Sequence, residues 1–170
     1  MLLTGFSPII APETRLLILG SMPGVESLRQ RQYYAHPRNT FWLIMGALVG
    51  ALPELDYNER VVVLKKNRIS LWDVIDRCVR PGSLDGDIER ESETVNPLID
   101  FCRDQPELRA LAFNGRKARE TFNRHFMKKD PVLWPSAAYR PAFNQSGLCL
   151  SAAGGQTQNL APITSAGFGW

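Results

Sequence analysis

The sequence predicts an α/β fold, a three-layer α/β/α sandwich around a mainly parallel central sheet. Short apolar runs that end at Gly, Asp or Asn alternate along the chain with segments of helical character. The hydrophobic fraction of 44% and the charged fraction of 22% are ordinary for a globular chain. No apolar run approaches the roughly 20 residues that cross a bilayer, so no membrane contact is expected. A length of 170 residues suits one domain with a sizeable core.

Three segments are predicted to form the strands of the sheet. Residues 15–21 contain the run Leu-Leu-Ile-Leu before a Gly, which is typical of a buried, parallel, central strand. Residues 69–75 and 108–113 are the second and third strands, and Asp73 lies near the end of the second. Asn114-Gly115 forms the turn after the third.

Helices are predicted over residues 40–49, 58–66, 94–103 and 116–126. The first begins at Asn39 or Thr40 as its cap. Val61, Val62 and Leu64 are expected to point inward from the second. Pro97 suits the first turn of the third, and residues 80–87, with two turn-forming dipeptides, are expected to form a loop.

Composition excludes several classes of site. Two His and three widely spaced Cys argue against a zinc site and against a disulfide framework, so no metal and no cofactor are expected. No secretory signal is visible at the N-terminus, which favours a cytoplasmic location. The net charge of +3 permits nucleic-acid binding without arguing for it. Between Pro131 and Trp170 only Arg140 is charged, and this segment is predicted to be rich in loops.

Polar segments follow the predicted strands at three places, and ligands of such sheets bind at the carboxyl ends of the strands. These segments are Gly20 to Gly24, the stretch after Trp72, and Asn114-Gly115. We therefore expect them to form a pocket. The first segment comprises Gly20, Ser21, Met22, Pro23 and Gly24. Its spacing fits neither a phosphate-binding loop, nor a dinucleotide fingerprint, nor a nucleophile elbow, and an ordinary strand-to-helix turn remains an alternative.

The stretch from Tyr33 to Trp42 is the most unusual in the chain because it combines aromatic residues with His36, Arg38 and Asn39. Aromatic rings stack on unpaired bases, and Arg pairs with phosphate. The alternative is a helix cap at Asn39 followed by core aromatics. Asn114 can read the edge of a base, or simply form a turn. Arg116 and Lys117 can hold phosphate, or simply form a solvated helix face.

Four segments in order resemble the uracil-DNA glycosylase superfamily and, more closely, its hypoxanthine-DNA (deoxyinosine) glycosylase family. They are LGSMPG at 19–24, QYYAHPRNTFW at 32–42, SLWDVIDRCVRPGSLD at 70–85 and AFNGRKA at 112–118. The resemblance implies one uracil-DNA-glycosylase-like domain over residues 1–170, acting as a monomer on DNA that contains a deaminated base. Such an enzyme flips the base out of the helix and hydrolyses its N-glycosidic bond without a metal. Hypoxanthine is the expected base, and uracil is second.

The resemblance also implies roles for individual residues. The catalytic asparagine of the family matches Asn39, whose amide would orient a water molecule and support the developing charge. The segment from Gly20 to Gly24 would line the base pocket, with Phe41 stacking on the base and Asn114 reading its edge. The residues expected to contact phosphate or to assist a proton are His36, Arg38, Arg116 and Lys117.

One part of the chain departs from the family pattern. Residues 1–130 match it, whereas residues 131–170 lack the expected Leu-Pro-Ser-Thr-Ser-Pro-Ala loop and the charged helix after it. Trp134 to Ala138 and Leu150 to Gly155 are the nearest segments. We interpret this as an altered C-terminal part, of the kind that a shift of reading frame produces. The alternatives are therefore a weak or inactive DNA-binding relative, or an α/β protein that binds a nucleotide or metabolite through Gly20 to Gly24.

Overall fold

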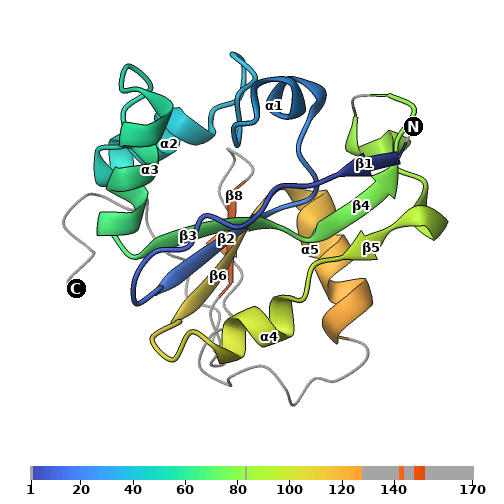
Figure 1. Ribbon diagram of the computed structural model, residues 1–170. Coiled ribbons are helices and arrows are strands. Elements are labelled where there is room, and N and C mark those ends of the chain that lie inside the picture. The colour runs from blue at the N-terminus through green and yellow to red at the C-terminus, as the bar shows by residue number, and fades with distance from the viewer. Residues whose placement is uncertain (1, 83, 128–141, 144–147, 152–170) are drawn as a thin grey trace.

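The main sheet of the protein has the strand order β3-β2-β6-β8-β7. The computed structural model describes residues 2–82 and 84–127, with the strands at 142–143 and 148–151. Strands β2 (Leu16–Gly20), β3 (Ile69–Asp73) and β6 (Ala110–Asn114) run parallel, with β2 in the middle (Figure 1). Strands β8 (Leu148–Ser151) and β7 (Ala142–Phe143) extend the sheet in antiparallel fashion. The expected α/β class is confirmed, and so is the central position of the first predicted strand.

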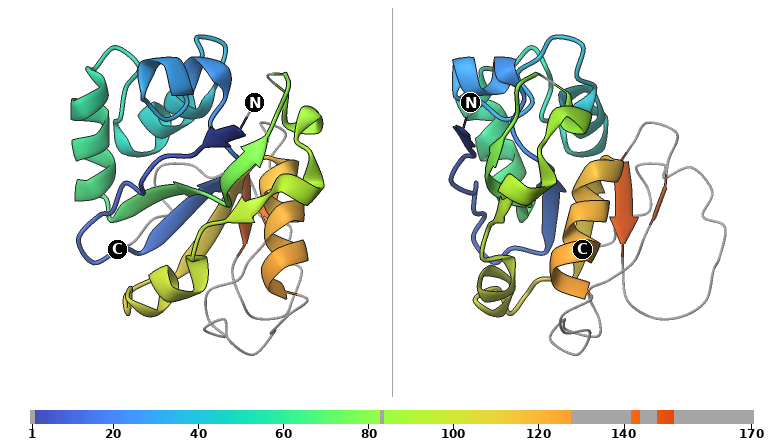
Figure 2. Two further views of the ribbon diagram at one scale, coloured as in Figure 1. Left: turned by 45° about the vertical axis from the view of Figure 1, so that its right-hand side comes forward. Right: turned by 90° about the vertical axis from the view of Figure 1, so that its right-hand side faces the viewer.

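Helices cover both faces of this sheet because its strands are apolar on both sides. Ile18 packs on the face shared with α2 (Phe41–Val49) and α3 (Tyr57–Lys66). Leu17 and Leu19 point the other way, toward α4 (Leu98–Arg103) and α5 (Arg116–Phe122). Figure 2 shows the two groups of helices on opposite sides of the strands. Helix α1 (Val25–Gln30) follows β2 directly.

A second, smaller sheet is formed by β1 (Leu2–Thr4), β4 (Ile75–Val79) and β5 (Thr94–Val95), in the antiparallel order β1-β4-β5. Two 3₁₀ turns, η1 (Asp85–Asp87) and η2 (Arg90–Ser92), lie between β4 and β5. A separate apolar cluster supports this sheet, and Met22 from the loop after β2 belongs to it.

Several element boundaries differ from the expectations. The helix predicted over 94–103 begins only at Leu98, because the residue before Pro97 avoids helical geometry and Thr94–Val95 pair with β4 instead. The strand predicted over 69–75 ends at Asp73, and the chain continues into the second sheet as β4. The helix predicted over 116–126 gives way after Phe122 to the π-helical turn η3 (Asn123–Met127).

The inward face of α3 is also narrower than expected. Leu64 is fully buried, whereas Val62 is 48% exposed because it lies about 200° around the helix axis from Leu64. In the segment expected to be rich in loops, β7 and β8 are strands of the main sheet. Trp134 to Ala138 and residues 152–155 lie outside the described residues. Within the described part of the chain, no helix is both long enough and apolar enough to cross a membrane.

Candidate functional site

The carboxyl ends of the three parallel strands meet as the sequence predicts. Gly20 of β2 lies opposite Asp73 of β3, and Leu19 lies opposite Phe113 of β6. Asn114, the last residue of β6, is therefore the neighbour of Gly20 on the other side. Three chemically different residues, Gly20, Asp73 and Asn114, thus share one edge of the sheet.

Gly20 makes a close approach possible between the strand and two polar side chains. A Cβ atom at this position would lie 2.2 Å from the Asp73 Oδ1 and 3.1 Å from the Tyr34 hydroxyl. Any side chain at residue 20 would displace one or both groups, because real Cβ contacts are never as short as the first distance. The absence of a side chain at Gly20 is what allows Asp73 and Tyr34 to meet here.

Asp73 is a buried acid that the sequence analysis noted but did not assign to the site. Its side chain is 2% exposed, and its Oδ2 has no hydrogen-bond partner among the described residues. Burial raises the pKa of Asp73 to about 8, with a further contribution from the negative charge of Asp85. The group is therefore mostly protonated at neutral pH, and it can donate a hydrogen bond to a ligand.

Tyr34 connects this edge with the loop before α2. Its φ angle of 56° lies in the left-handed region, which a bulky residue rarely adopts and which is found where surrounding structure imposes it. Burial raises the pKa of the Tyr34 hydroxyl well above its ordinary value, and Asp73 raises it further, while the nearby Asn114 amide acts in the opposite direction. The hydroxyl is buried with no geometric hydrogen-bond partner among the described residues.

Phe41 lies in the core of the protein, beneath the ring of Tyr34. Its side chain is only 2% exposed, and the Tyr34 ring stacks on it with a centroid separation of 3.9 Å. As the first residue of α2, Phe41 belongs to the core beside Trp42. Tyr34 covers the Phe41 ring in this arrangement, so a base could stack on Phe41 only if Tyr34 moved, and the role of Phe41 stays a prediction.

The loop after β2 divides its side chains between several environments. Ser21 donates a hydrogen bond to Asp85 with an Oγ–Oδ2 distance of 2.7 Å, and Met22 is buried in the core of the smaller sheet. The Pro23 carbonyl accepts a hydrogen bond of 2.8 Å from the buried Arg80 guanidinium. Gly24 precedes the first turn of α1. Of these four residues, Ser21 is the one whose side chain contacts Asp85, the acid whose charge raises the pKa of Asp73.

His36, Arg38 and Asn39 form one exposed turn. The Asn39 Oδ1 accepts a hydrogen bond of 2.9 Å from the Phe41 backbone N–H, so this side chain caps α2. The Asn39 N–H donates to the His36 carbonyl, and the His36 Nδ1 accepts from the Arg38 N–H. This arrangement holds the Asn39 amide at the surface, where its Nδ2 has no hydrogen-bond partner within the described chain and one lone pair of Oδ1 remains available.

A cavity of about 260 Å³ opens beside this turn. Tyr34, His36 and Asn39 line it, together with Trp42 and Arg60. Tyr34 therefore belongs both to this cavity and to the group around Gly20 and Asp73. The predicted residues Gly20 to Gly24 and Asn114 do not line the cavity itself.

The two basic residues at the start of α5 have different surroundings. Arg116 is 82% exposed and lies 3.6 Å from Glu120. The Lys117 ammonium lies 2.8 Å from Glu93, whose carboxylate is fully buried and also contacts Arg124 and His125. Burial alone would raise the pKa of Glu93, but Lys117 and Arg124 outweigh it and hold this pKa below its usual range. Arg116 therefore lies in solvent beside Glu120, whereas Lys117 is held in a largely buried ion pair.

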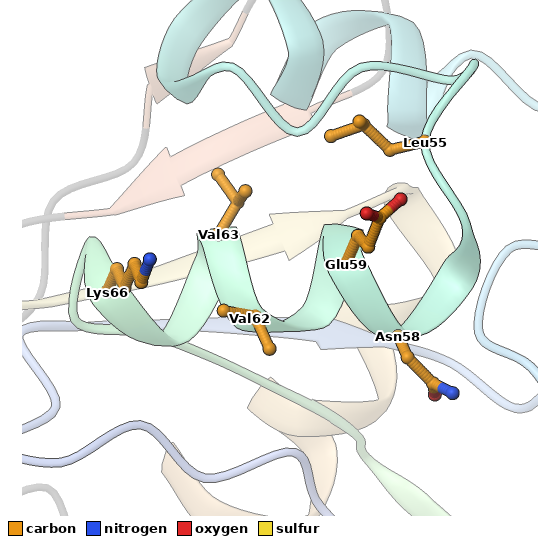
Figure 3. A pocket seen from close by; sticks show the side chains of 6 residues that line it. All are labelled: Leu55, Asn58, Glu59, Val62, Val63 and Lys66. Carbon is orange, nitrogen blue, oxygen red and sulfur yellow. The ribbon is translucent and has the colours of Figure 1, made fainter.

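A second hollow, of about 400 Å³, runs along the outer side of α3. Figure 3 shows Val62, Val63 and Lys66 around it, with Leu55 above the helix. None of the predicted site residues lines this hollow, and nothing in it points to a ligand. Elsewhere within the described residues, no group of three or more His, Cys, Asp or Glu side chains could hold a metal ion.

Two residues of the site were missed at the level of sequence, Asp73 and Tyr34. An acidic residue that closes an otherwise apolar strand was the available signal for Asp73. Tyr34 lies in an aromatic-rich stretch, and no pattern in the sequence distinguishes its ring from the others, since the left-handed backbone and the stacking on Phe41 are properties of the folded chain.

Comparison with known proteins identifies relatives of this chain. The family model described as "Uracil DNA glycosylase superfamily" matches residues 7–157. A protein of Methanosarcina barkeri named hypoxanthine DNA glycosylase is 41% identical over 68% of this chain and 73% of its own length. A protein of the same name from Methanosarcina acetivorans is also 41% identical, over 71% of this chain and 75% of its own length.

A solved structure shares both sequence and fold. The solution NMR structure of a candidate uracil DNA glycosylase from Methanosarcina acetivorans matches with a TM-score of 0.64 and 38% identity, covering 75% of this chain and 78% of that one. The residues 7–157 that the family model matches include the loop after β2, the exposed turn with Asn39 and the ends of all three parallel strands. The chain therefore belongs to the uracil DNA glycosylase superfamily.

Proposed function

We propose that the protein is a DNA glycosylase that releases hypoxanthine from deoxyinosine in DNA, with uracil as a second base. The observation that carries the proposal is the group of buried polar atoms at the carboxyl edge of the sheet, next to the turn that presents Asn39. The names of the two relatives support hypoxanthine as the base. We also propose that the protein acts as a cytoplasmic monomer without a metal.

The reaction is a hydrolysis at the C1′ carbon of the deoxyribose. The bond from C1′ to the base nitrogen breaks, and its electron pair leaves with the base. The water oxygen bonds to C1′. One water proton stays on the new C1′ hydroxyl group, and the other is transferred to the released base. In the proposal the base first rotates out of the helix into the site. The enzyme must then orient the water and stabilise the negative charge that develops on the base.

The described residues can divide this work. Asn39 would hold the attacking water through its amide, which cannot act as a strong base. Tyr34 would form the aromatic wall of the base site in place of Phe41. Asp73, in its protonated form, and Asn114 would donate hydrogen bonds to the edge of the base. His36, Arg38 and Arg116 would contact phosphate, and the role of His36 in moving a proton remains an alternative.

The test is release of the base from duplex oligonucleotides that carry one inosine or one uracil. Abasic sites are revealed by alkaline cleavage, and the wild-type chain is compared with Asn39→Ala and with Asn58→Ala. Asn58 is an exposed residue on α3, so its replacement is a matched control. We expect release of hypoxanthine by the wild type and the control, and a loss of at least a hundredfold for Asn39→Ala.

Three outcomes would contradict the proposal. Equal rates for Asn39→Ala and the wild type would remove Asn39 from the reaction. DNA binding without release of either base would favour the inactive relative suggested by the atypical segment after residue 130. Affinity for free nucleotides and none for DNA would favour the metabolite-binding alternative.

A further inference from the structure

The cavity beside Asn39 contains the guanidinium of Arg60, which forms no close ion pair within the described part of the chain. We propose that this cavity is a subsite for one phosphodiester group of the DNA strand and that Arg60 of α3 binds the phosphate. The inference rests on the proposed function for its ligand, because it takes DNA as the source of the phosphate.

Aromatic rings hold the Arg60 guanidinium in place. Its central carbon lies 4.6 Å from the centroid of the Trp42 ring and 5.7 Å from that of the Tyr57 ring. Such stacking uses the face of the guanidinium and leaves the N–H donors in its plane for an acceptor. The group is therefore oriented in advance, which reduces the entropy lost on binding an anion.

No acceptor within the described residues uses these donors. The Arg60 Nε is buried and has no hydrogen-bond partner there, and the Asp56 carboxylate, one turn earlier on the chain, acts on Arg60 only through its charge and not through a close ion pair. Partial burial lowers the pKa of this guanidinium from its ordinary value, but an arginine stays charged in a protein. A half-buried cation that lacks a partner favours an anionic ligand.

The rest of the cavity wall also suits an anion. Gln32 and Asn39 contribute neutral amides that can donate, and His36 contributes an imidazole, whereas the Gln30 amide already donates to Glu26 outside the cavity lining. No aspartate or glutamate of the described chain lines the cavity itself. A volume of about 260 Å³ can admit a phosphate group with its bridging oxygens. One arginine with neutral donors around it is the composition by which proteins bind phosphodiesters.

The direction of α3 places Arg60 toward the carboxyl edge of the main sheet. Helix α3 ends at Lys66 just before β3 begins at Ile69, so it runs opposite to the parallel strands. Its first turns therefore lie toward the carboxyl edge of the sheet, where the base site is proposed (Figure 1). Since Asn39 lines the same cavity, a phosphate bound by Arg60 would flank the nucleotide whose base is released.

Arg60→Gln and Lys66→Gln form the experimental pair. Each removes one positive charge from α3, but Lys66 lies at the opposite end of the helix and lines the other hollow (Figure 3). Affinity for an inosine duplex is measured by fluorescence anisotropy over a range of salt concentrations. For Arg60→Gln we expect roughly tenfold weaker binding and a slope of log K against log salt reduced by about one. Lys66→Gln should change neither.

A scan with neutral linkages identifies the phosphate itself. Single methylphosphonate groups replace, one at a time, the phosphodiesters that flank the inosine. Replacement of one particular linkage should weaken DNA binding by the wild type roughly tenfold. The same replacement should not weaken DNA binding by Arg60→Gln any further, because that variant has already lost the contact. Arg60→Lys, which keeps the charge, should retain this sensitivity in part, and it serves as the test variant if Arg60→Gln fails to fold by circular dichroism.

The outcomes separate this inference from the proposed function. If every linkage affects Arg60→Gln and the wild type equally, or if Lys66→Gln matches Arg60→Gln, the subsite is refuted. It is also refuted if inorganic phosphate binds in an Arg60-dependent manner while DNA binding is independent of Arg60. An Arg60-dependent linkage without base release would instead uphold the subsite and refute the proposed catalysis.

Discussion

Asp73 illustrates how one buried residue can set the pH response of both stability and activity. Its pKa is raised to about 8 in the folded protein, far above the ordinary value of 3.8. Between these two values the unfolded chain loses the proton while the folded chain keeps it. The free energy of unfolding must therefore fall as the pH rises from about 4 to about 8, by up to about 1.4 kcal/mol per pH unit from this group.

The neutral isostere tests this response. Asp73→Asn preserves the size of the side chain and a donor group but cannot ionise, so it should flatten the decline in unfolding free energy over that pH range. Urea unfolding at several pH values measures the effect. A wild-type decline that persists unchanged in Asp73→Asn would assign it to other groups.

Activity should follow the same proton in the proposed mechanism. The wild-type rate of base release should fall above about pH 8, as Asp73 loses its ability to donate. Asp73→Asn should retain activity without this alkaline decline, whereas Asp73→Ala should lose activity. Single-turnover rates of hypoxanthine release between pH 6 and pH 10 would measure the difference. A decline of equal size in Asp73→Asn would contradict the role of Asp73.

Gly20 provides a steric test of the same group of residues. Gly20→Ala places a methyl group where Asp73 and Tyr34 now approach the backbone, so base release should fall at least tenfold. The matched control is Gly86→Ala, because a Cβ atom at Gly86 would have no neighbour within 4 Å. The same release assay applies. Full activity of a folded Gly20→Ala variant would show that this close approach is dispensable.

At the scale of elements, one carboxylate fastens α5 and η3 to the smaller sheet. Glu93 precedes β5, and its buried carboxylate contacts the side chains of Lys117 in α5 and of Arg124 and His125 in η3. Because Lys117 and Arg124 hold the pKa of Glu93 down, the contribution to stability is present above the ordinary pKa of a glutamate and is lost as the pH falls through the lower, folded value.

Removal of this carboxylate should loosen α5. Glu93→Gln should lower the free energy of unfolding at neutral pH by about 2 kcal/mol, since charge-assisted hydrogen bonds are lost in a buried setting. Glu120→Gln removes an exposed partner of Arg116 and should change stability little. Urea unfolding of both variants gives the comparison. Equal stabilities for the two variants would contradict a structural role for Glu93.

Elements with strong local patterns could be predicted from the sequence. The apolar run before Gly20 and the amphipathic segment before Lys66 gave a strand and a helix close to their observed bounds. Thr94–Val95 could not be predicted as a strand, because a strand of two residues depends on its partner β4 in a sheet formed from distant segments. The same dependence on tertiary contacts explains why Phe41 was expected in the site and Tyr34 was not.

At the scale of the whole molecule, a general rule for parallel sheets predicts that the loops after the strands meet at one edge, but it does not predict the protonation state of the residues that meet there. Because the strands were expected to be parallel, the segments that follow Gly20, Asp73 and Asn114 were expected to meet at one edge of the sheet. Whether an acid among them is ionised depends on burial, and burial depends on the complete fold. That residues 1–170 form one domain, and that residues 131–170 weaken the activity, remain predictions.

The ladder between β6 and β8 has a consequence for association between copies of the chain. A parallel sheet of such apolar strands would offer unpaired backbone groups at each lateral boundary, and those groups could recruit a strand from another molecule. Strand β8 covers β6 on one side, while the Ile9–Leu71 bridge and the hydrogen bond from Ala11 to Ser70 cover β3 on the other. Among the described residues, the boundary beyond β8 is the two-residue strand β7, which is too short to template further pairing. Strands β7 and β8 therefore protect the sheet against aggregation, whatever they contribute to catalysis.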